Sequence, residues 1–396
     1  MNILFIAMTH SIHTARWISQ IADQGWDLHL FPSEDGGVTH PDFSNVTIYH
    51  SFYANQVKVD KSVAQRGVST RSPMIALGAR NILKRVYPDY QVNRLARLIR
   101  RLKPDIIHSL EIQHAGYLTM AVRKRFTGHF PPWIVTNWGS DIYLYGRLGA
   151  HKSRIQEVLT ACDYYSCECR RDVCLAKGLG FEGTVLPVFP NTGGFDLQEL
   201  AQLRSAGLVS DRKIIMLKGY QHFAGRALVG LRALERCMDV LSGYEVVIYS
   251  AAASVEVAAE LFCQSTGIKT TIIPNDTPHR HIMALHGKAR ISLGLSISDA
   301  ISTSLLEAIA MGSFPIQSWT ACADEWIEDG VNGLLVPPED PDIVEQAIRR
   351  AVTDDKLVNH AAEINCRLAA EKLEHSLLKD KTIALYTSIG KERGLA

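Results

Sequence analysis

Residues 293–316, LGLSISDAISTSLLEAIAMGSFPI, place a short apolar run, a polar loop and a helical pattern in direct succession. This order predicts a buried parallel strand, a loop at its carboxyl end and a following helix. Two acidic residues edge the loop and the helix start, Asp299 and Glu307. The predicted first turn is formed by Ser302, Thr303 and Ser304. Because a helix start presents unpaired backbone N–H groups, the segment predicts a site for a phosphate.

The same residues allow a second interpretation. Ser304 is followed three residues later by Glu307, which matches a capping box. In that motif the glutamate carboxylate only satisfies the start of the helix. The sequence leaves both roles of Glu307 open.

Two cations precede this segment on what we expect to be the same sheet. Residues 216–226, MLKGYQHFAGR, end one strand and open a helix, with Lys218 and Arg226 at its edge. Cations there can neutralise a diphosphate leaving group. Alternatively, Lys218 and Arg226 have no binding role and are solvated surface charges.

The rest of the chain alternates strands and helices, which predicts two α/β domains with parallel sheets for a chain of 396 residues. Strands are predicted at residues 2–7, 27–31, 46–50, 105–108, 133–136, 163–166 and 184–187, and then at 213–217, 245–249, 270–273, 290–295 and 314–317. Helices are predicted at 14–22, 92–102, 115–125 and 153–162, and then at 227–240, 255–265, 279–285, 304–311 and 343–351. Turn formers near residues 187–194 separate the domains, 1–190 and 195–370. The last helix, about 371–396, is predicted to cross back onto the first domain.

Composition excludes several classes of protein. Lys and Arg number 42 against 41 Asp and Glu, a net charge of +1, so nucleic-acid binding is not expected. No run of 18 apolar residues predicts a membrane span, and the apolar run Ile3–Met8 is too short for a secretion signal. The eight cysteines lie mostly in apolar segments, which favours free thiols and a cytoplasmic location.

No metal is expected. The spacing of the clustered cysteines lacks paired Cys-x2-Cys knuckles and does not favour zinc; these are Cys162, Cys167, Cys169 and Cys174. Asp340-Pro-Asp342 resembles an acidic metal motif, but Asp340 as N-cap and Pro341 at the first helical position account for it.

A local basic stretch runs from Lys58 to Lys103, with only Asp60 and Asp89 as acids. Its basic residues include Arg66, Arg71, Arg80, Lys84, Arg85, Arg94, Arg97, Arg100 and Arg101. Three of the arginines share a helical stripe beside Leu95, Leu98, Ile99 and Leu102. Such a stripe predicts peripheral contact with anionic lipid headgroups, against the alternative of a merely solvated face.

The C-terminal half resembles glycosyltransferase family 4, which has the GT-B fold. Members carry a Glu, seven residues, a second Glu, then Ala-x-Ala-x-Gly-x-Pro and later Asp-Gly-x-Asn-Gly-Leu-Leu-Val. This chain has Asp299, seven residues and Glu307, then AIAMGSFP at 308–315 and DGVNGLLVP at 329–337. In the first half, PDIIH at 104–108 and WGSD at 138–141 resemble members that build bacterial surface polysaccharides.

The resemblance implies two Rossmann-like domains facing a central cleft. It also implies transfer, with retention and without a cofactor, from a nucleotide diphosphate sugar, UDP-linked, to a glycan or lipid-linked acceptor. Glu307 would bind the donor ribose, Asp299 the hydroxyls of the transferred sugar, and Lys218 and Arg226 the diphosphate. The remaining donor-side residues implied are Asn275 beside the base, Ser302, Thr303 and Ser304 at the phosphate, and His13 and Thr14 on the cleft wall.

Four residues are candidates for the acceptor side. His108 and His114 follow one predicted strand, and Trp138 and Asp141 follow the next. A His at a strand end is also commonly structural, Trp138 fits a partly buried aromatic residue, and Asp141 fits a turn or cap.

The chain departs from the family pattern in three places. Its first acid is Asp299, one methylene shorter than Glu, and its first loop reads THSIHTAR at 9–16 in place of a glycine-rich loop. Many members also have a His near the position of Trp138. Two other functions therefore stay open: a nucleotide-sugar epimerase or hydrolase on this fold, and a catalytically silent scaffold.

Overall fold

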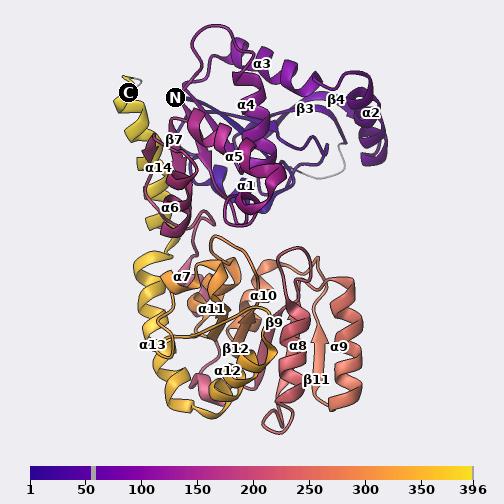
Figure 1. The fold of residues 1–396 in the computed structure, drawn as a ribbon, viewed down its shortest axis with the longest axis vertical. Coiled ribbons are helices and arrows are strands. Elements are labelled where there is room, and N and C mark those ends of the chain that lie inside the picture. The colour runs from indigo at the N-terminus through magenta and orange to yellow at the C-terminus, as the bar shows by residue number, and fades with distance from the viewer. Residues whose placement is uncertain (55–58, 395–396) are drawn as a thin grey trace. The chain divides into compact units, whose positions relative to one another are not determined.

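The computed structural model describes residues 1–54 and 59–394 (Figure 1). Lys58, at the start of the basic stretch, and residues 395–396 of the predicted last helix lie outside these ranges. The chain divides into two compact units. The first is Met1–Gly193 together with the chain from Leu378 onward, and the second is Gly194–Leu377.

The first unit is built on an eight-stranded parallel sheet with the order β4-β3-β2-β1-β5-β6-β7-β8. The strands are β1 (Asn2–Ala7), β2 (Asp27–Pro32), β3 (Thr47–Ala54), β4 (Ala64–Thr70), β5 (Ile106–Leu110), β6 (Trp133–Thr136), β7 (Tyr164–Ser166) and β8 (Thr184–Val185). In β1, Ile3 and Phe5 enter one hydrophobic cluster, whereas Leu4 and Ile6 enter another. Because both faces are covered, the strand is a continuous apolar run.

Helices cover both faces of this sheet. They are α1 (Ile12–Ser19), α2 (Pro73–Val86), α3 (Tyr90–Leu102), α4 (Tyr117–Arg123), α5 (Gly149–Ala161) and α6 (Arg170–Gly178), with short helical turns at Ile112–Gly116 and Tyr145–Arg147. The last helix, α14 (His375–Glu392), also packs on this unit, where Trp17 Nε1 donates to Tyr386 Oη at 2.8 Å. The predicted return of the C-terminal helix to the first domain is confirmed.

The second unit is built on a six-stranded parallel sheet with the order β11-β10-β9-β12-β13-β14. Its strands are β9 (Ile214–Lys218), β10 (Glu245–Tyr249), β11 (Lys269–Ile272), β12 (Ala289–Gly294), β13 (Phe314–Ser318) and β14 (Leu334–Val336). Its helices are α7 (Leu197–Ala201), α8 (Ala227–Arg236), α9 (Ala253–Thr266), α10 (His279–His286), α11 (Thr303–Met311), α12 (Pro341–Thr353) and α13 (Asp355–Lys372), with short turns at Val209–Asp211, Trp319–Ala321 and Ala323–Glu325. The two-domain parallel α/β fold is confirmed.

The leucines of the predicted lipid-contacting stripe on α3 do not face a membrane. Leu95, Leu98 and Ile99 are buried in the core of the first unit, and Leu102 packs against the same cluster. The apolar side of α3 is therefore its core face, because the helix must cover the sheet beneath it.

No helix among the residues that the structure describes is long and apolar enough to cross a membrane.

Candidate functional site

Lys218, Asp299 and the start of α11 lie in the second unit, at the carboxyl ends of the neighbouring strands β9 and β12. Lys218 ends β9, and the loop after β12 carries Asp299 toward α11. Backbone hydrogen bonds join the two loops, from Arg226 N to Leu295 O at 3.0 Å and from Ile297 N to Ala224 O at 2.9 Å. Ligands of open α/β sheets bind at this edge.

A lysine lies beside the start of α11. Lys218 Nζ is 3.3 Å from Ser302 Oγ and 4.4 Å from the centre of the Tyr220 ring. Ser302 is the N-cap residue, but its hydroxyl bonds Ser304 Oγ at 2.7 Å and does not cap the helix. The N–H groups of the first turn therefore receive no cap from Ser302. A lysine and an uncapped helix start together favour a phosphate anion.

Glu307 lies in the same helix and is only 6% exposed. Its Oε1 lies 2.7 Å from His279 Nε2, and its Oε2 lies 3.7 Å from His286 Nε2. Burial opposes ionisation, but the hydrogen bond from His279 and the charges of His279 and Lys218 hold the pKa of Glu307 below its ordinary value. The ionised carboxylate only accepts hydrogen bonds, so it suits the hydroxyl groups of a ribose.

The capping-box interpretation of Glu307 is wrong. The N-cap of α11 is Ser302, so Glu307 lies beyond the first turn, and the side-chain partners described above lie on α10. Glu307 does not satisfy the helix start, and burying a carboxylate costs free energy. The buried charge is therefore expected to have another role. The geometry therefore favours a binding role.

Three residues near Glu307 were not predicted. His279 and His286 begin and end α10, and Tyr249 ends β10. The Tyr249 ring lies 5.4 Å from that of His286, whose Nδ1 is 2.8 Å from Ser292 Oγ. Burial lowers the pKa of His286 to about 4 and keeps it neutral. In the sequence, the one signal for His279 is its position directly after Pro278. The packing of α10 on α11, which brings His279 and His286 to Glu307, cannot be read from the sequence.

Arg226 currently has other partners than a phosphate. Its Nε donates to Glu339 Oε1 at 2.8 Å, and Nη1 donates to the backbone oxygen of Gly225 at 2.9 Å. The Glu339 side chain is 63% exposed. Since exposed ion pairs contribute little stability, Arg226 can leave Glu339 and bind a diphosphate with little loss of free energy.

The other donor candidates are placed as follows. Asp299 is half-buried and its Oδ1 accepts from Ala300 N at 3.0 Å. Asn275 is exposed, and its Nδ2 donates to Ala251 O at 3.4 Å in the loop after β10. Thr303 is half-buried at the start of α11. All three lie in the second unit with Lys218 and Glu307.

The motif at residues 329–337 is structural. Buried Asn332 accepts from Glu328 N at 2.7 Å and donates to Trp326 O at 3.0 Å and to Asn365 Oδ1 at 2.9 Å. These bonds fix the turn that leads into β14.

In the first unit, Asp141 joins two loops at the carboxyl edge of the sheet. Its Oδ2 accepts from Trp138 N and from Ile112 N, both at 2.9 Å. The ring of His13, at the start of α1, lies 6.0 Å from the ring of Trp138. The predicted residues His13, Trp138 and Asp141 therefore gather at one edge of the sheet.

Glu111 lies at this edge and was not predicted. Its backbone has φ of 90°, which is unusual for a residue other than glycine. Its carboxylate accepts from His114 N at 2.8 Å and also from Ala115 N, while the His114 ring Nε2 lies 3.2 Å from Glu34. Burial raises the pKa of Glu111 to about 6, and burial and the charge of Glu111 raise the pKa of Asp141. Strained backbone and shifted carboxyl groups are typical of functional sites.

The predicted ligand contacts of His108 and Thr14 are wrong. Both side chains are fully buried. His108 Nδ1 lies 2.7 Å from Tyr386 Oη and Nε2 lies 2.6 Å from Thr136 Oγ1, so the ring joins α14 to the sheet. Neither side chain can reach a ligand at the surface of the unit.

Burial lowers the pKa of His108 to about 3, which predicts a pH dependence of stability. The unfolded chain binds a proton at His108 below about pH 6.5, whereas the folded chain does not. Stability should therefore fall as the pH decreases below 6.5, by about 2 kcal/mol at pH 5 from this residue alone. Denaturant unfolding at pH 7 and pH 5 measures the loss of folding free energy between these pH values. In His108→Gln this loss should be smaller than in the parent by about 2 kcal/mol. Equal losses in both proteins would show that His108 is not held neutral.

Two family models match the chain, one in each unit. The Glycosyl transferase 4-like family matches residues 2–164, in the first unit, and the Glycosyl transferases group 1 family matches residues 254–365, in the second. No curated protein matches the sequence significantly.

Three of the similar solved structures have low sequence identity to this chain. Sucrose-phosphate synthase from Thermosynechococcus elongatus has a TM-score of 0.71 at 14% identity, with 99% of this chain and 100% of that chain covered. The α,α-trehalose 6-phosphate synthase from Burkholderia multivorans has a TM-score of 0.71 at 13% identity, with 100% and 98% covered. The Anabaena protein HepE in complex with UDP-glucose has a TM-score of 0.67 at 12% identity, with 98% and 99% covered.

These structures share the fold of the chain over nearly its whole length, and the two family matches fall in its two units. The chain is therefore a glycosyltransferase of the family 4 type with the GT-B fold.

Proposed function

We propose that this glycosyltransferase transfers a sugar from a UDP-sugar to a glycan or lipid-linked acceptor in surface-polysaccharide synthesis, with retention of anomeric configuration. The observation that carries the proposal is the pair formed by ionised, buried Glu307 and the uncapped helix start beside Lys218. One group accepts hydrogen bonds from ribose, and the other attracts the diphosphate. The solved complex of HepE with UDP-glucose supports UDP as the nucleotide.

The residues of the second unit suit cleavage of the donor. When the bond between the anomeric carbon and the phosphate oxygen breaks, negative charge develops on the diphosphate. Lys218 and the start of α11 stabilise that charge, Arg226 joins them after leaving Glu339, and Asp299 holds sugar hydroxyls. The acceptor oxygen bonds the anomeric carbon on the same face, and its proton passes to the leaving phosphate. We propose that no protein nucleophile and no metal cofactor takes part.

We assign the acceptor to the first unit. Trp138 offers an aromatic face beside His13, and Asp141 with Glu111 places carboxyl groups of raised pKa at the same sheet edge. Such groups can hold acceptor hydroxyls.

A thermal-shift panel with UDP, GDP and ADP tests the nucleotide. A ligand at 100 times its dissociation constant stabilises the folded state by about 2.7 kcal/mol, so UDP should give the largest shift. Labelled UDP-sugars with extracted acceptors then test transfer, and the anomeric configuration of the product tests retention. Turnover without any acceptor would indicate the epimerase or hydrolase, and binding without turnover would indicate the scaffold.

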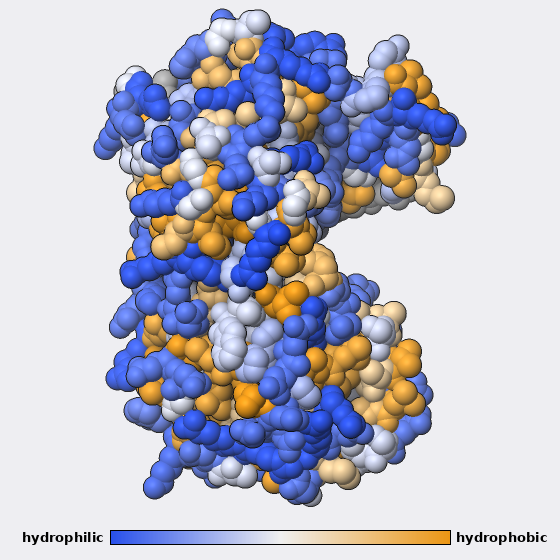
Figure 2. All heavy atoms as spheres, in the orientation of Figure 1, coloured by the Kyte–Doolittle hydropathy of each residue, from blue (hydrophilic) through white to orange (hydrophobic). Residues whose placement is uncertain are grey.

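We further propose that the enzyme acts at the cytoplasmic face of an anionic membrane and that α2 makes the contact. Large apolar side chains of this helix point to solvent, with Met74 82% and Ile82 68% exposed, and Figure 2 shows hydrophobic residues gathered over α2. The same helix carries exposed Lys84 and Arg85. An apolar face flanked by basic residues matches the interface of an anionic bilayer.

The double substitution Met74→Asp with Ile82→Asp should abolish sedimentation with vesicles that contain phosphatidylglycerol, because it places charge on the inserting face. Binding of the parent should weaken as salt rises. The matched control is Met238→Asp with Leu261→Asp, two exposed apolar residues of the second unit. If both double variants sediment like the parent, α2 is not the contact.

A further inference from the structure

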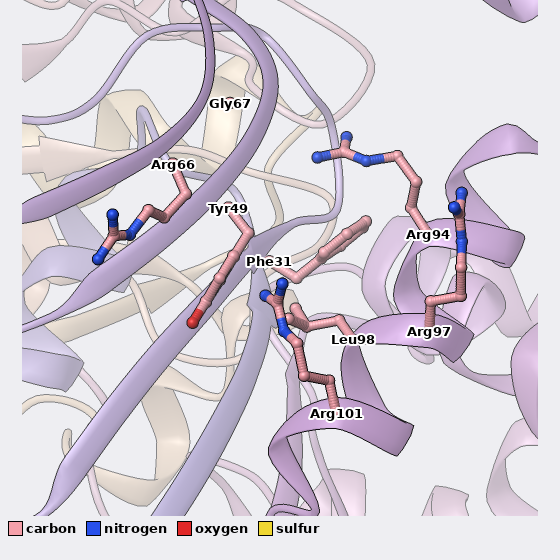
Figure 3. Close-up of a pocket in the computed structure, with 8 residues that line it drawn as sticks. All are labelled: Phe31, Tyr49, Arg66, Gly67, Arg94, Arg97, Leu98 and Arg101. Carbon is pink, nitrogen blue, oxygen red and sulfur yellow. The ribbon is translucent and has the colours of Figure 1, made fainter.

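A cavity of about 790 Å³ opens in the first unit between the strands β2, β3 and β4 and the helix α3 (Figure 3). Four arginines and two aromatic residues line it: Arg66, Arg94, Arg97, Arg101, Phe31 and Tyr49. We call it the arginine pocket. It is separate from the donor site, which lies in the second unit.

Three of the four guanidinium groups have no acidic partner in the part of the chain that the structure describes. Arg66, Arg97 and Arg101 are exposed, and within residues 1–54 and 59–394 none forms a salt bridge. Arg94 differs, because it donates to the backbone oxygen of His50 at 2.7 Å and to Ser51 Oγ and lies 3.8 Å from Asp35. Unneutralised cations gathered around one cavity repel each other, so an anion in the cavity would be favourable.

Aromatic rings help to position two of the arginines. The guanidinium carbon of Arg101 lies 5.4 Å from the centre of the Tyr49 ring, and that of Arg94 lies 5.7 Å from the Phe31 ring. Figure 3 shows the side chains of Arg94 and Arg101 extending from α3 toward these rings. Arg97 extends from the same helix away from the rings, and Arg66 lies on a strand beyond Tyr49. Cation–π contacts hold the guanidinium groups of Arg94 and Arg101 at the wall of the pocket.

We propose that the arginine pocket is a second anion site, which binds a phosphate-bearing ligand. Guanidinium groups pair with phosphate through two parallel hydrogen bonds, and three or four of them match a diphosphate better than a single carboxylate. The inference goes beyond the transfer reaction, because no residue of the pocket belongs to the donor site. The phosphate can come from a soluble diphosphate or from the headgroup of a lipid.

Calorimetric titration of the full chain with inorganic pyrophosphate tests the site. The triple substitution Arg66→Gln, Arg97→Gln and Arg101→Gln removes the exposed charges and spares Arg94, which is bonded to the sheet. We expect pyrophosphate to bind about tenfold or more weakly to the triple variant. The matched control is Arg100→Gln, because Arg100 is exposed on the same helix but lies 4.9 Å from the Phe126 ring and does not line the pocket.

Pyrophosphate can also enter the donor site, so the titration is repeated with Lys218→Ala. Pyrophosphate binding that is lost in the triple variant but kept in Lys218→Ala is binding to the arginine pocket. UDP affinity should be unchanged in the triple variant, which also shows that it is folded. A failure of UDP to bind any variant would therefore contradict the proposed donor and leave the pocket test valid.

Vesicles of phosphatidylcholine with and without phosphatidylglycerol distinguish the two sources of phosphate. Loss of both pyrophosphate and vesicle binding in the triple variant supports the pocket with a lipid headgroup as ligand. Loss of pyrophosphate binding alone supports the pocket with a soluble ligand. If the triple variant binds pyrophosphate like Arg100→Gln, or the parent does not bind it, the proposal is overturned.

Discussion

Lys218→Ala is expected to lower turnover by about 10²–10³, which corresponds to about 3–4 kcal/mol of lost transition-state stabilisation. The reason is the position of Lys218 Nζ, 3.3 Å from Ser302 Oγ at the start of α11, where the diphosphate should develop negative charge. UDP affinity should fall as well, because a hydrogen bond to a charged group contributes about 1.5–3 kcal/mol, but uridine affinity should not change. Initial rates and calorimetry measure these effects.

The matched control is Lys213→Ala. Lys213 precedes the same strand at its other end and lies 4.6 Å from the Tyr244 ring, so its loss should leave turnover unchanged. Arg226→Ala should act in the same direction as Lys218→Ala, since Arg226 lies in the adjoining loop. If Lys218→Ala turns over like the control, the diphosphate is held elsewhere.

Glu307→Gln is expected to weaken UDP and uridine alike, by about ten- to hundredfold, because the carboxylate should bind the ribose that both ligands share. Lys218→Ala, in contrast, should lower the affinity for UDP but not the affinity for uridine. Calorimetric titration of both variants with both ligands gives the comparison. Weaker binding of both ligands to Glu307→Gln would show that binding requires the charge of the carboxylate. The hydrogen bond from His279 helps to maintain this charge.

A thermal melt controls for damage to the fold. Glu307 is buried and paired, so some loss of stability accompanies the substitution in any case. His279→Gln keeps the carboxylate and changes its partner, and it should weaken uridine much less. Should Glu307→Gln melt earlier but bind uridine like the parent, the carboxylate has only a structural role.

The sequence predicts the buried strands well, because covered strands are apolar runs with clear ends. The predicted runs at 2–7, 133–136 and 245–249 coincide with β1, β6 and β10. It predicts exposed or weakly apolar elements poorly. The strand β4, AQRGVST, is mostly exposed, and α2 buries only Ala76 and Arg80, so neither has the pattern of a core element.

Periodicity shows which residues share a face of a helix but does not show which face is buried. On α3 it correctly groups Arg94, Arg97 and Arg101, yet the neighbouring leucines pack into the core and the arginines line a pocket. The same limit hides α2, whose apolar residues face solvent.

The donor site is predictable where the chemistry is local. The spacing of Asp299 and Glu307 and the position of Lys218 follow from one strand-loop-helix pattern. His279 and His286 reach Glu307 only because α10 packs on α11, and Glu111 stands out only through its positive φ. Tertiary contacts and backbone strain are not visible in residue order.

A structure determined with UDP bound is the most direct test of the proposed donor site. We expect the diphosphate at the backbone N–H groups of Thr303 and Ser304, with Lys218 Nζ in hydrogen-bonding distance of a phosphate oxygen. We also expect the ribose hydroxyls to bind the carboxylate of Glu307. UDP bound at another place on the second unit, with Glu307 still contacting only its histidines, would contradict the proposed donor site.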